Sequence, residues 1–193
     1  MNKSLQYLVI AFVLLLILFI VNRMQQSRYS ASSELIFNID ENKIGRILML
    51  DTNGDSLILV KTDTTWSMPQ ADTLVIKDRQ INQFFDKIVN GKYDMIRSKN
   101  PNNWSKYGVT DSLGKTVSLF DNNNNLIKSV IFSNKGQDYS HNNYRIIGEN
   151  EVYRTTENIF YIINISPNYW GSPPKVEKDS LDIDKIQPTP LIK

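Results

Sequence analysis

An unbroken apolar run near the amino terminus limits this chain more than any other feature. It covers Leu5–Val21 and contains one polar residue, Gln6, and no charge. At about 1.5 Å per residue, such a run is at the short end of the roughly 17 to 25 residues that cross a bilayer as a helix. Lys3 and Arg23 flank the run, and long basic side chains of this kind reach toward the headgroups. The sequence therefore predicts a membrane anchor in residues 1–23, with its helix at about residues 5–21.

Two other interpretations of this run remain open. A cleaved signal peptide needs small residues just after the apolar run, but the first pair, Ser30 and Ser32, lies well beyond Val21. A buried helix of a soluble protein usually has a polar face, and this run has none. The basic residues on its two sides are nearly balanced, so charge alone does not orient it. Because long domains translocate largely regardless of charge, we expect a cytoplasmic amino terminus and an external domain.

The charge of the remaining chain argues against nucleic acid as a partner. The net charge is +2, from 22 basic and 20 acidic residues, but Lys3, Arg23 and Arg28 lie in a segment without acids. Without these three, 19 basic residues face 20 acidic ones, a net charge of −1. A near-neutral domain has no electrostatic footprint for DNA or RNA. The sequence also contains no cysteine, which excludes disulfides, thiolate metal sites and a cysteine nucleophile.

Composition divides the rest of the chain into a tether, a folded domain and a tail. Residues 24–34 are small and polar, which predicts a short tether. Residues 35–170 carry regular apolar patterns and predict one extracytoplasmic α+β domain. Residues 171–193 contain four prolines and few apolar side chains, which predicts a flexible tail, with a docking peptide as the alternative.

Short apolar segments bounded by turn residues predict a β-sheet in this domain. In chain order, the predicted strands are 43–51, 56–62, 64–68 and 93–98, followed by KTVSLFD, LIKSVIFS, NYRIIG, EVYRT and IFYIIN. A long polar stretch, Asn100–Gly114, is predicted to be a connection. Because long crossovers between strands are missing, the sheet is expected to be a mostly antiparallel meander.

One amphipathic helix interrupts the strand pattern at residues 78–92. Its apolar face has the i, i+3, i+4, i+7 spacing and consists of Ile81, Phe84, Phe85 and Ile88. Asp78 is the predicted amino-terminal cap, and Gly91 is predicted to take the left-handed position after the end. We expect this helix to cover one face of the sheet.

The segment Leu48–Val60 has two possible meanings. Asp51, Asn53 and Asp55 alternate like the first oxygen ligands of an EF-hand calcium loop. That loop needs helices on both sides and a bidentate acid at its twelfth position, where this chain has Thr62. Asn-Gly between two apolar runs is instead the strongest short hairpin signal, because both residues tolerate positive φ. The sequence predicts a hairpin here and no metal site.

The sequence offers little enzyme chemistry, and we predict no catalytic, metal-binding or cofactor-binding residue. His141 is the only histidine, so a serine–histidine–acid triad would have to use it, with Asp138 and Ser140 as its sequence neighbours. Since no glycine-framed nucleophilic serine occurs, we expect a solvated loop histidine. Gly114–Thr116 lacks the glycine spacing of a phosphate-binding loop and predicts a turn.

Aromatic residues, 10% of the chain, permit a ligand-binding platform. Such rings more often fill a β-sheet core, with the polar tip hydrogen-bonded, and we favour that interpretation. The residues concerned are Trp66, Trp104 and Trp170, and the tyrosines at positions 93, 107, 139, 144, 153, 161 and 169.

Several landmarks follow one another in order between Ile44 and Trp170. They are a strand pair ending in TTWSM, then QADTLV, then KYGV (Lys106–Val109), then NNYRIIGENEVYRT (Asn142–Thr155), and finally Trp170. In this order they resemble the bacterial family named domain of unknown function 4340, over about two thirds of the chain. Val109 departs from the leucine that is usual in that family.

The resemblance implies a membrane-anchored protein of the bacterial cell envelope. Members of that family are typically of this kind, and some are encoded beside ABC transporters of the gliding-motility auxiliary type. The leading prediction is therefore a non-enzymatic accessory protein of the bacterial inner membrane, single-pass, with its domain in the periplasm or exterior and a membrane-protein complex as its partner. The alternatives are a binding module for an envelope glycan or small ligand and, third, an envelope hydrolase with distant paired carboxylates.

Overall fold

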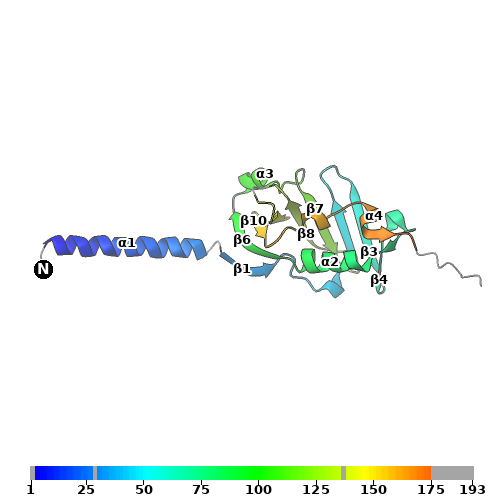
Figure 1. Ribbon diagram of the computed structural model, residues 1–193, viewed down its shortest axis with the longest axis horizontal. Coiled ribbons are helices and arrows are strands. Elements are labelled where there is room, and N and C mark those ends of the chain that lie inside the picture. Colours follow the sequence, from blue (N-terminus) through cyan, green and yellow to red (C-terminus); the bar gives the residue numbers. More distant parts are fainter. Residues whose placement is uncertain (1–2, 28–29, 136–137, 175–193) are drawn as a thin grey trace, which may run out of the picture.

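The computed structural model describes residues 3–27, 30–135 and 138–174, as one long helix followed by an α+β domain (Figure 1). The domain contains a nine-stranded sheet, a two-stranded sheet and a few short helices. The predicted fold class is confirmed: an apolar amino-terminal helix precedes a mostly antiparallel β-sheet domain with one main amphipathic helix.

Helix α1 extends over Lys3–Ser27, beyond both ends of the predicted helix. Its apolar part, Lys3–Arg23, is 21 residues long, and none of it is buried against the domain. At about 1.5 Å per residue this part measures roughly 31 Å, close to the hydrocarbon thickness of a bilayer. By length and composition, α1 can cross a membrane.

All neighbouring strands of the large sheet are antiparallel, in the order β1-β6-β10-β9-β8-β7-β2-β3-β4. The strands are β1 (Ser30–Leu35), β2 (Arg46–Leu50), β3 (Ser56–Thr62), β4 (Thr65–Ser67), β6 (Lys92–Ser98), β7 (Lys115–Phe120), β8 (Leu126–Ser133), β9 (Asn143–Ile146) and β10 (Val152–Thr155). The small sheet pairs β5 (Val75–Ile76) with β11 (Gly171–Ser172). The predicted meander holds within β2–β4 and within β7–β10. Pairs between β2 and β7, and between β6 and β10, join distant parts of the chain.

Strand β1 takes the place of much of the predicted tether at 24–34. Ser30 lies opposite Met95 of β6, at the edge of the large sheet. The segment lacks the apolar alternation that predicts a strand. It still forms one, because an edge strand can be held by main-chain hydrogen bonds along one side. The predicted boundary is therefore wrong: the helix reaches Ser27, and the domain begins at Ser30 rather than at residue 35.

The domain also extends past its predicted carboxyl-terminal limit at residue 170. Gly171 of β11 lies opposite Ile76 of β5. A strand of two residues is too short to show an alternation of apolar and polar side chains, so the sequence does not predict it. The first residues of the predicted tail at 171–193 are thus part of the domain, and residues 175–193 lie outside the described part of the chain.

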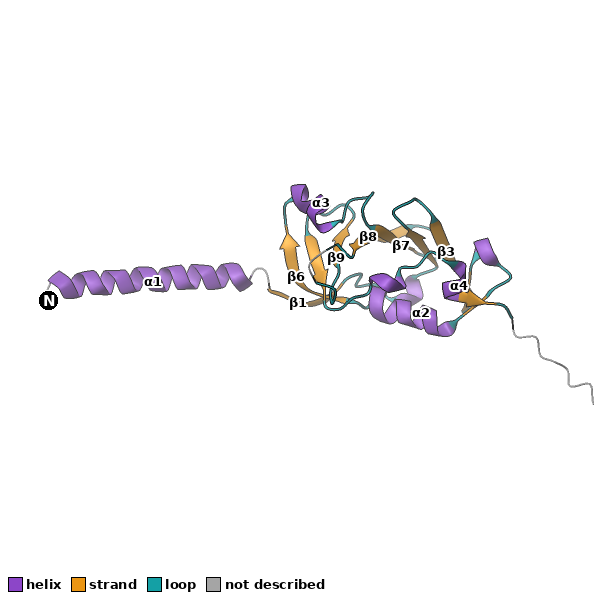
Figure 2. Ribbon diagram, turned by 45° about the horizontal axis from the view of Figure 1, so that its top comes forward, coloured by secondary structure: helices purple, strands orange, loops and turns teal. Residues whose placement is uncertain are grey.

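The predicted amphipathic helix is present as α2 (Asp78–Phe84), continued by a π-helical turn, η3 (Phe85–Val89). Figure 2 shows α2 lying alongside the large sheet. The predicted apolar face is buried in the core: Ile81, Phe84, Phe85 and Ile88. The core therefore lies between this helix and the sheet, as the spacing indicates.

Both predicted ends of this helix are wrong. The amino-terminal cap is Lys77, and Asp78 is the first helical residue, where its carboxylate still interacts favourably with the helix dipole. Gly91 does not have a positive φ, because the π-helical turn ends the helix before it. Gly91 is needed for space instead, since a Cβ atom there would lie 2.2 Å from the Lys87 carbonyl oxygen.

Short helical turns occupy several predicted connections and one predicted strand. They are η1 (Glu41–Lys43), η2 (Pro69–Ala71), η4 (Pro101–Asn103), α3 (Trp104–Tyr107), η5 (Phe160–Ile162) and α4 (Pro167–Trp170). The strand predicted for IFYIIN is wrong, because this segment is η5. Asn142 Oδ1 accepts hydrogen bonds from the main-chain N–H groups of Ile159 at 2.6 Å and Phe160 at 3.0 Å. These groups are thereby satisfied without a neighbouring strand.

The segment between β2 and β3 is a hairpin, as predicted. Asp51 Oδ1 accepts hydrogen bonds from the main-chain N–H groups of Asn53 at 2.8 Å and Asp55 at 3.0 Å. The three residues that resemble calcium ligands are thus hydrogen-bonded to one another within one turn. Gly54, not Asn53, has the positive φ, at +87°. The turn therefore depends on one left-handed residue rather than the two expected from Asn-Gly.

Replacing Gly54 by valine should lower the free energy of unfolding by about 1–2 kcal/mol, because a side chain at this φ strains the backbone. No atom lies within 4 Å of the position of an added Cβ, so overlap adds nothing. Asn53→Val, the matched control at an exposed neighbour, should cost less than ~0.5 kcal/mol. Urea unfolding of the full chain in detergent, followed by circular dichroism, measures both losses. Equal losses, or a calcium-dependent melting temperature, would contradict this description of the turn.

Candidate functional site

A groove lies beside α2 at the β4 edge of the large sheet, and we call it the Trp66 groove. Its volume is about 490 Å³. Its apolar lining comes from Trp66 on β4, Val75 and Ile76 on β5, and Ile81 and Phe85 on the α2–η3 helix. Strand β4 is at the opposite edge of the sheet from β1, and Figure 1 shows it at the end of the domain away from α1.

The position of Trp66 follows from the alternation of a three-residue edge strand. Thr65 and Ser67 are exposed, whereas Trp66 is turned toward the helix and half-buried. The centroids of the Trp66 and Phe85 rings are 5.8 Å apart, a contact distance for aromatic rings. Lys61 of β3 lies opposite Trp66 and also lines the groove. The tryptophan ring therefore packs against Phe85, while part of its surface stays accessible.

Polar groups line the rim of the Trp66 groove. Glu41 Oε1 accepts a hydrogen bond from Asn90 Nδ2 at 2.6 Å, which holds the carboxylate in place. Asp78 and Asn82, one turn apart on α2, add a second carboxylate and an amide. With Lys61, the rim carries two acids and one base. An aromatic surface with such a rim can receive an apolar side chain of a partner protein, or stack a sugar ring and hydrogen-bond its hydroxyls.

The free edge of β4 adds a second means of contact beside the groove. In the large sheet β4 pairs with β3 alone, so its outer main-chain groups are not used within that sheet. Free edges of this kind pair with extended segments of partner proteins. The edge and the Trp66 groove together form one surface suited to an extended peptide with apolar side chains.

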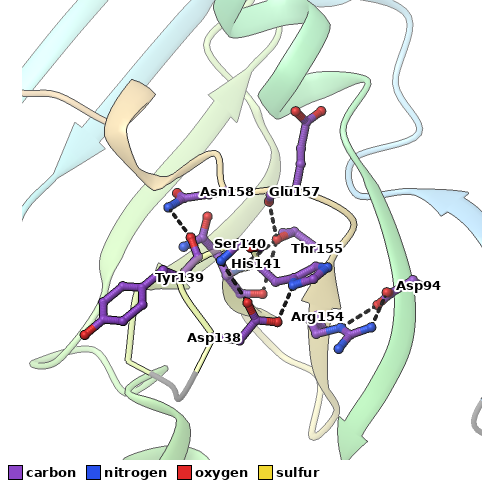
Figure 3. Close-up of polar contacts among 10 residues, drawn as sticks. Asp94, Asp138, Tyr139, Ser140, His141, Arg154, Thr155, Glu157 and Asn158 are labelled. Atoms are coloured by element: carbon purple, nitrogen blue, oxygen red, sulfur yellow. Dashed lines mark hydrogen bonds and ion pairs between the residues drawn. The ribbon is translucent and has the colours of Figure 1, made fainter.

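His141 lies in a second polar cluster, on the segment before β9 (Figure 3). Its Nδ1 is paired with Asp138 Oδ2. Asp138 also accepts a hydrogen bond from the Ser140 main-chain N–H at 2.8 Å. This N–H, followed by the imidazole, holds the pKa of Asp138 below its usual value. The pair closes a tight turn.

The arrangement does not form a serine–histidine–aspartate triad within the described residues. Ser140 contributes its main-chain N–H, and no serine or threonine hydroxyl is hydrogen-bonded to the His141 ring in that part of the chain. The Thr155 hydroxyl, drawn nearby in Figure 3, donates to the Glu157 carbonyl oxygen at 2.7 Å. The predicted solvated histidine needs one correction, since the His141 side chain is only 24% exposed.

Most of the predicted aromatic platform belongs to the core. Trp170 and Tyr144 are 0% and 1% exposed. Tyr144 stacks on Tyr153 with ring centroids 5.0 Å apart, and Tyr93 contacts Tyr153 at 4.9 Å. Burial, with a hydrogen bond to Glu34, raises the pKa of Tyr93 to about 12. These rings are packing residues.

Several aromatic residues differ from this pattern. Tyr139 and Tyr161 are 92% and 55% exposed and stand apart in the sequence. Trp66 lines a groove with helix residues, and Tyr107 of α3 lines a second cavity, described below. A tryptophan on a strand of three residues was a usable signal in the sequence. The composition of the groove was not, because its residues come from three separate stretches of the chain, within 41–42, 61–66 and 75–85.

The sequence predicted no catalytic, metal-binding or cofactor-binding residue. In the ranges that the structure describes, no group of three or more histidine, aspartate or glutamate side chains is placed to hold a metal ion. Comparison with known proteins finds no family model, no curated protein and no solved structure that matches the chain. The resemblance to domain of unknown function 4340 stays a prediction.

Proposed function

We propose that this protein is a membrane-anchored accessory protein whose external domain docks a partner membrane complex. The observation that carries this proposal is the connection between α1 and the sheet. An unburied apolar helix of membrane-spanning length is separated by two residues from β1, which is built into the sheet edge. Such a connection keeps the domain at the membrane surface and raises its effective concentration near a membrane partner.

The proposed location combines this helix with the resemblance and with the length of the domain. The anchor is single-pass, in the bacterial inner membrane, and the domain faces the periplasm or exterior. The bacterial envelope comes from the resemblance, and the external side from the tendency of long domains to translocate. The partner is an ABC-type transporter or a comparable envelope complex, which the resemblance also favours.

The Trp66 groove and the free β4 edge form the proposed docking surface. They lie at the edge opposite β1, so a partner can reach them without displacing the strand that follows the anchor. The role is one of binding rather than catalysis. The Asp138–His141 pair is the best candidate for catalysis in the sequence, and its contacts stabilise a turn.

A photo-reactive amino acid placed at Val75 should crosslink one membrane protein in intact cells. Val75 lines the Trp66 groove and is 57% exposed, so its replacement leaves the core intact. The matched control is Leu126, which is 58% exposed at the start of β8. Mass spectrometry identifies the captured protein. Capture of the same proteins from both positions, or of none from Val75, contradicts the docking surface.

A glycan or small-ligand binding module is the second candidate, favoured by the half-buried Trp66 beside carboxylate and amide groups. It predicts that isolated envelope glycan binds the detergent-solubilised chain and that Trp66→Ala abolishes this binding. Glycan binding together with absent protein capture at Val75 would replace the accessory role by this one.

A further inference from the structure

A second cavity, of about 620 Å³, lies between β6, α3, β9 and β10. Four of its lining residues are basic, and we call it the basic cavity: Arg97, Lys106, Lys135 and Arg154. Asp138 is the one acid among the residues that line it within the described ranges. The domain as a whole is nearly neutral, so this local excess of positive charge marks a site for an anion.

Two of the basic groups are already held in position. Arg154 Nε donates to Asp94 Oδ1 at 2.9 Å, and a second guanidinium nitrogen pairs with Asp94 Oδ2 (Figure 3). The hydrogen bond to this carboxylate raises the pKa of Arg154, and the carboxylate offsets the charge of the guanidinium. Lys135 Nζ donates to the Ser105 carbonyl oxygen at 3.0 Å, a neutral partner that leaves its charge uncompensated. The charge of Asp138 is turned toward His141.

Two buried polar atoms of the lining residues lack a hydrogen-bond partner in the described chain. They are Arg97 Nε, a donor, and Asn143 Oδ1, an acceptor. Asn143 is only 4% exposed, and its Nδ2 donates to the Lys135 carbonyl oxygen at 2.6 Å, which leaves Oδ1 as the free atom. Buried polar atoms are nearly always paired. Arg97 and Asn143 both line the basic cavity, so a ligand that offers an anionic oxygen and a hydrogen-bond donor would pair these two atoms if their side chains turned toward it.

The strand register places the basic cavity close to the carboxyl-terminal end of α1, where its apolar part stops. Ser30 lies opposite Met95, and Met95 lies opposite Arg154. The apolar part of α1 ends at Arg23. One further helical turn to Ser27 and three residues to Ser30 span at most about 17 Å. Figure 1 shows β6, β10 and α3 at the end of the domain next to α1.

We propose that the basic cavity binds the phosphodiester of a glycerophospholipid headgroup from the membrane that α1 crosses. Guanidinium and ammonium groups bind the anionic phosphate oxygens. Asn143 Oδ1 accepts a hydrogen bond from a hydroxyl or ammonium group on the headgroup alcohol. Phosphatidylglycerol has such a group and a net negative charge, whereas phosphatidylcholine has no such donor and its choline offsets the charge of the phosphate. The inference rests on the proposed anchoring by α1 but does not depend on any partner at the Trp66 groove.

Lipid binding by the full chain in neutral detergent tests this site. Phosphatidylglycerol and phosphatidylcholine are titrated separately, and bound lipid is counted by native mass spectrometry. We expect phosphatidylglycerol to bind the unaltered chain at least about tenfold more tightly than phosphatidylcholine, the effect of one good charge-assisted contact. The double variant Arg97→Gln, Lys106→Gln should lose this preference.

The matched control, Lys43→Gln with Lys61→Gln, removes the same charge far from the cavity and should keep the preference. Equal affinity for the two lipids in the unaltered chain overturns the proposal, whether or not the cavity variant folds. So does a preference that survives in a folded cavity variant, or that the control also loses. Glycerol phosphate binding as tightly as the lipid would assign the cavity to a soluble phosphoester. Because lipid is added to solubilised protein, these outcomes are distinct from a failure of α1 to enter a membrane.

Discussion

Trp170→Ala should lower the free energy of unfolding by about 3–5 kcal/mol, the largest stability effect expected from a single substitution in this domain. Trp170 is 0% exposed, and its ring meets the Phe84 ring edge-to-face with centroids 6.0 Å apart. Its Nε1 donates to the Asn164 carbonyl oxygen at 2.5 Å. The Trp170 carbonyl oxygen accepts from the Lys77 N–H at 2.8 Å, at the start of α2. Removal of the ring leaves a cavity and an unpaired carbonyl where the end of the domain meets its main helix.

Tyr139→Ala is the matched control, because Tyr139 is 92% exposed, and its loss should stay within about 0.5 kcal/mol. Urea unfolding of the full chain in detergent, followed by far-ultraviolet circular dichroism, measures both variants without relying on tryptophan fluorescence. A domain typically has a free energy of unfolding of about 5–15 kcal/mol, so Trp170→Ala would remove a large part of it. A loss below 1 kcal/mol in Trp170→Ala would show that α2 and the carboxyl-terminal segment are not joined as described.

The double substitution Leu14→Arg, Leu15→Arg should release the protein from membranes. Both residues lie near the middle of Lys3–Arg23 and are 57% and 65% exposed, so they take no part in the domain core. Each arginine near the centre of a spanning helix costs about 2.5–3.5 kcal/mol on insertion scales. Sodium carbonate extraction of cells, followed by immunoblotting, measures the fraction that remains in the membrane.

Leu14→Ile with Leu15→Ile is the control and should remain in the membrane fraction. The mass of the mature control chain also decides the alternative of a cleaved signal peptide, since an uncleaved anchor retains the amino-terminal helix. Full retention of the arginine variant in the carbonate-resistant fraction would contradict a spanning helix. It would also remove the reason to expect a headgroup from that membrane in the basic cavity, although lipid binding itself is measured separately in detergent.

Local patterns in the sequence were sufficient for much of the fold. The buried face of α2 follows from the spacing of four apolar residues, and the β2–β3 hairpin from one Asn-Gly pair. A second turn repeats this logic, because Asp121 Oδ1 accepts from the N–H groups of Asn123 and Asn125 at 2.9 and 2.8 Å. Asn124 there takes the positive φ, at +66°. Such features involve residues within a few positions of one another, so the sequence contains their whole cause.

Three features escaped sequence reasoning because their causes are distant in the chain. Strand β1 is polar and forms because β6, more than fifty residues later, offers it an edge. The apolar IFYIIN segment forms η5 because the side-chain oxygen of Asn142 accepts hydrogen bonds from two of its main-chain N–H groups. Gly91 is required by the course of the preceding helix, not by a left-handed turn. In each case a partner outside the local pattern decides the conformation.

The sequence alone determined that this chain has an apolar helix of membrane-spanning length and an antiparallel α+β domain. Both follow from periodicity and hydrophobicity, which act along a continuous stretch of chain. Only the tertiary structure decided where binding surfaces lie. The Trp66 groove and the basic cavity each collect residues from several elements. The charges of Arg97, Lys135 and Arg154 come together only when β6, β10 and the segment after β8 are brought side by side by the sheet. A site assembled by long-range strand pairing has no local pattern to reveal it, because the physical contact exists only after the chain has folded.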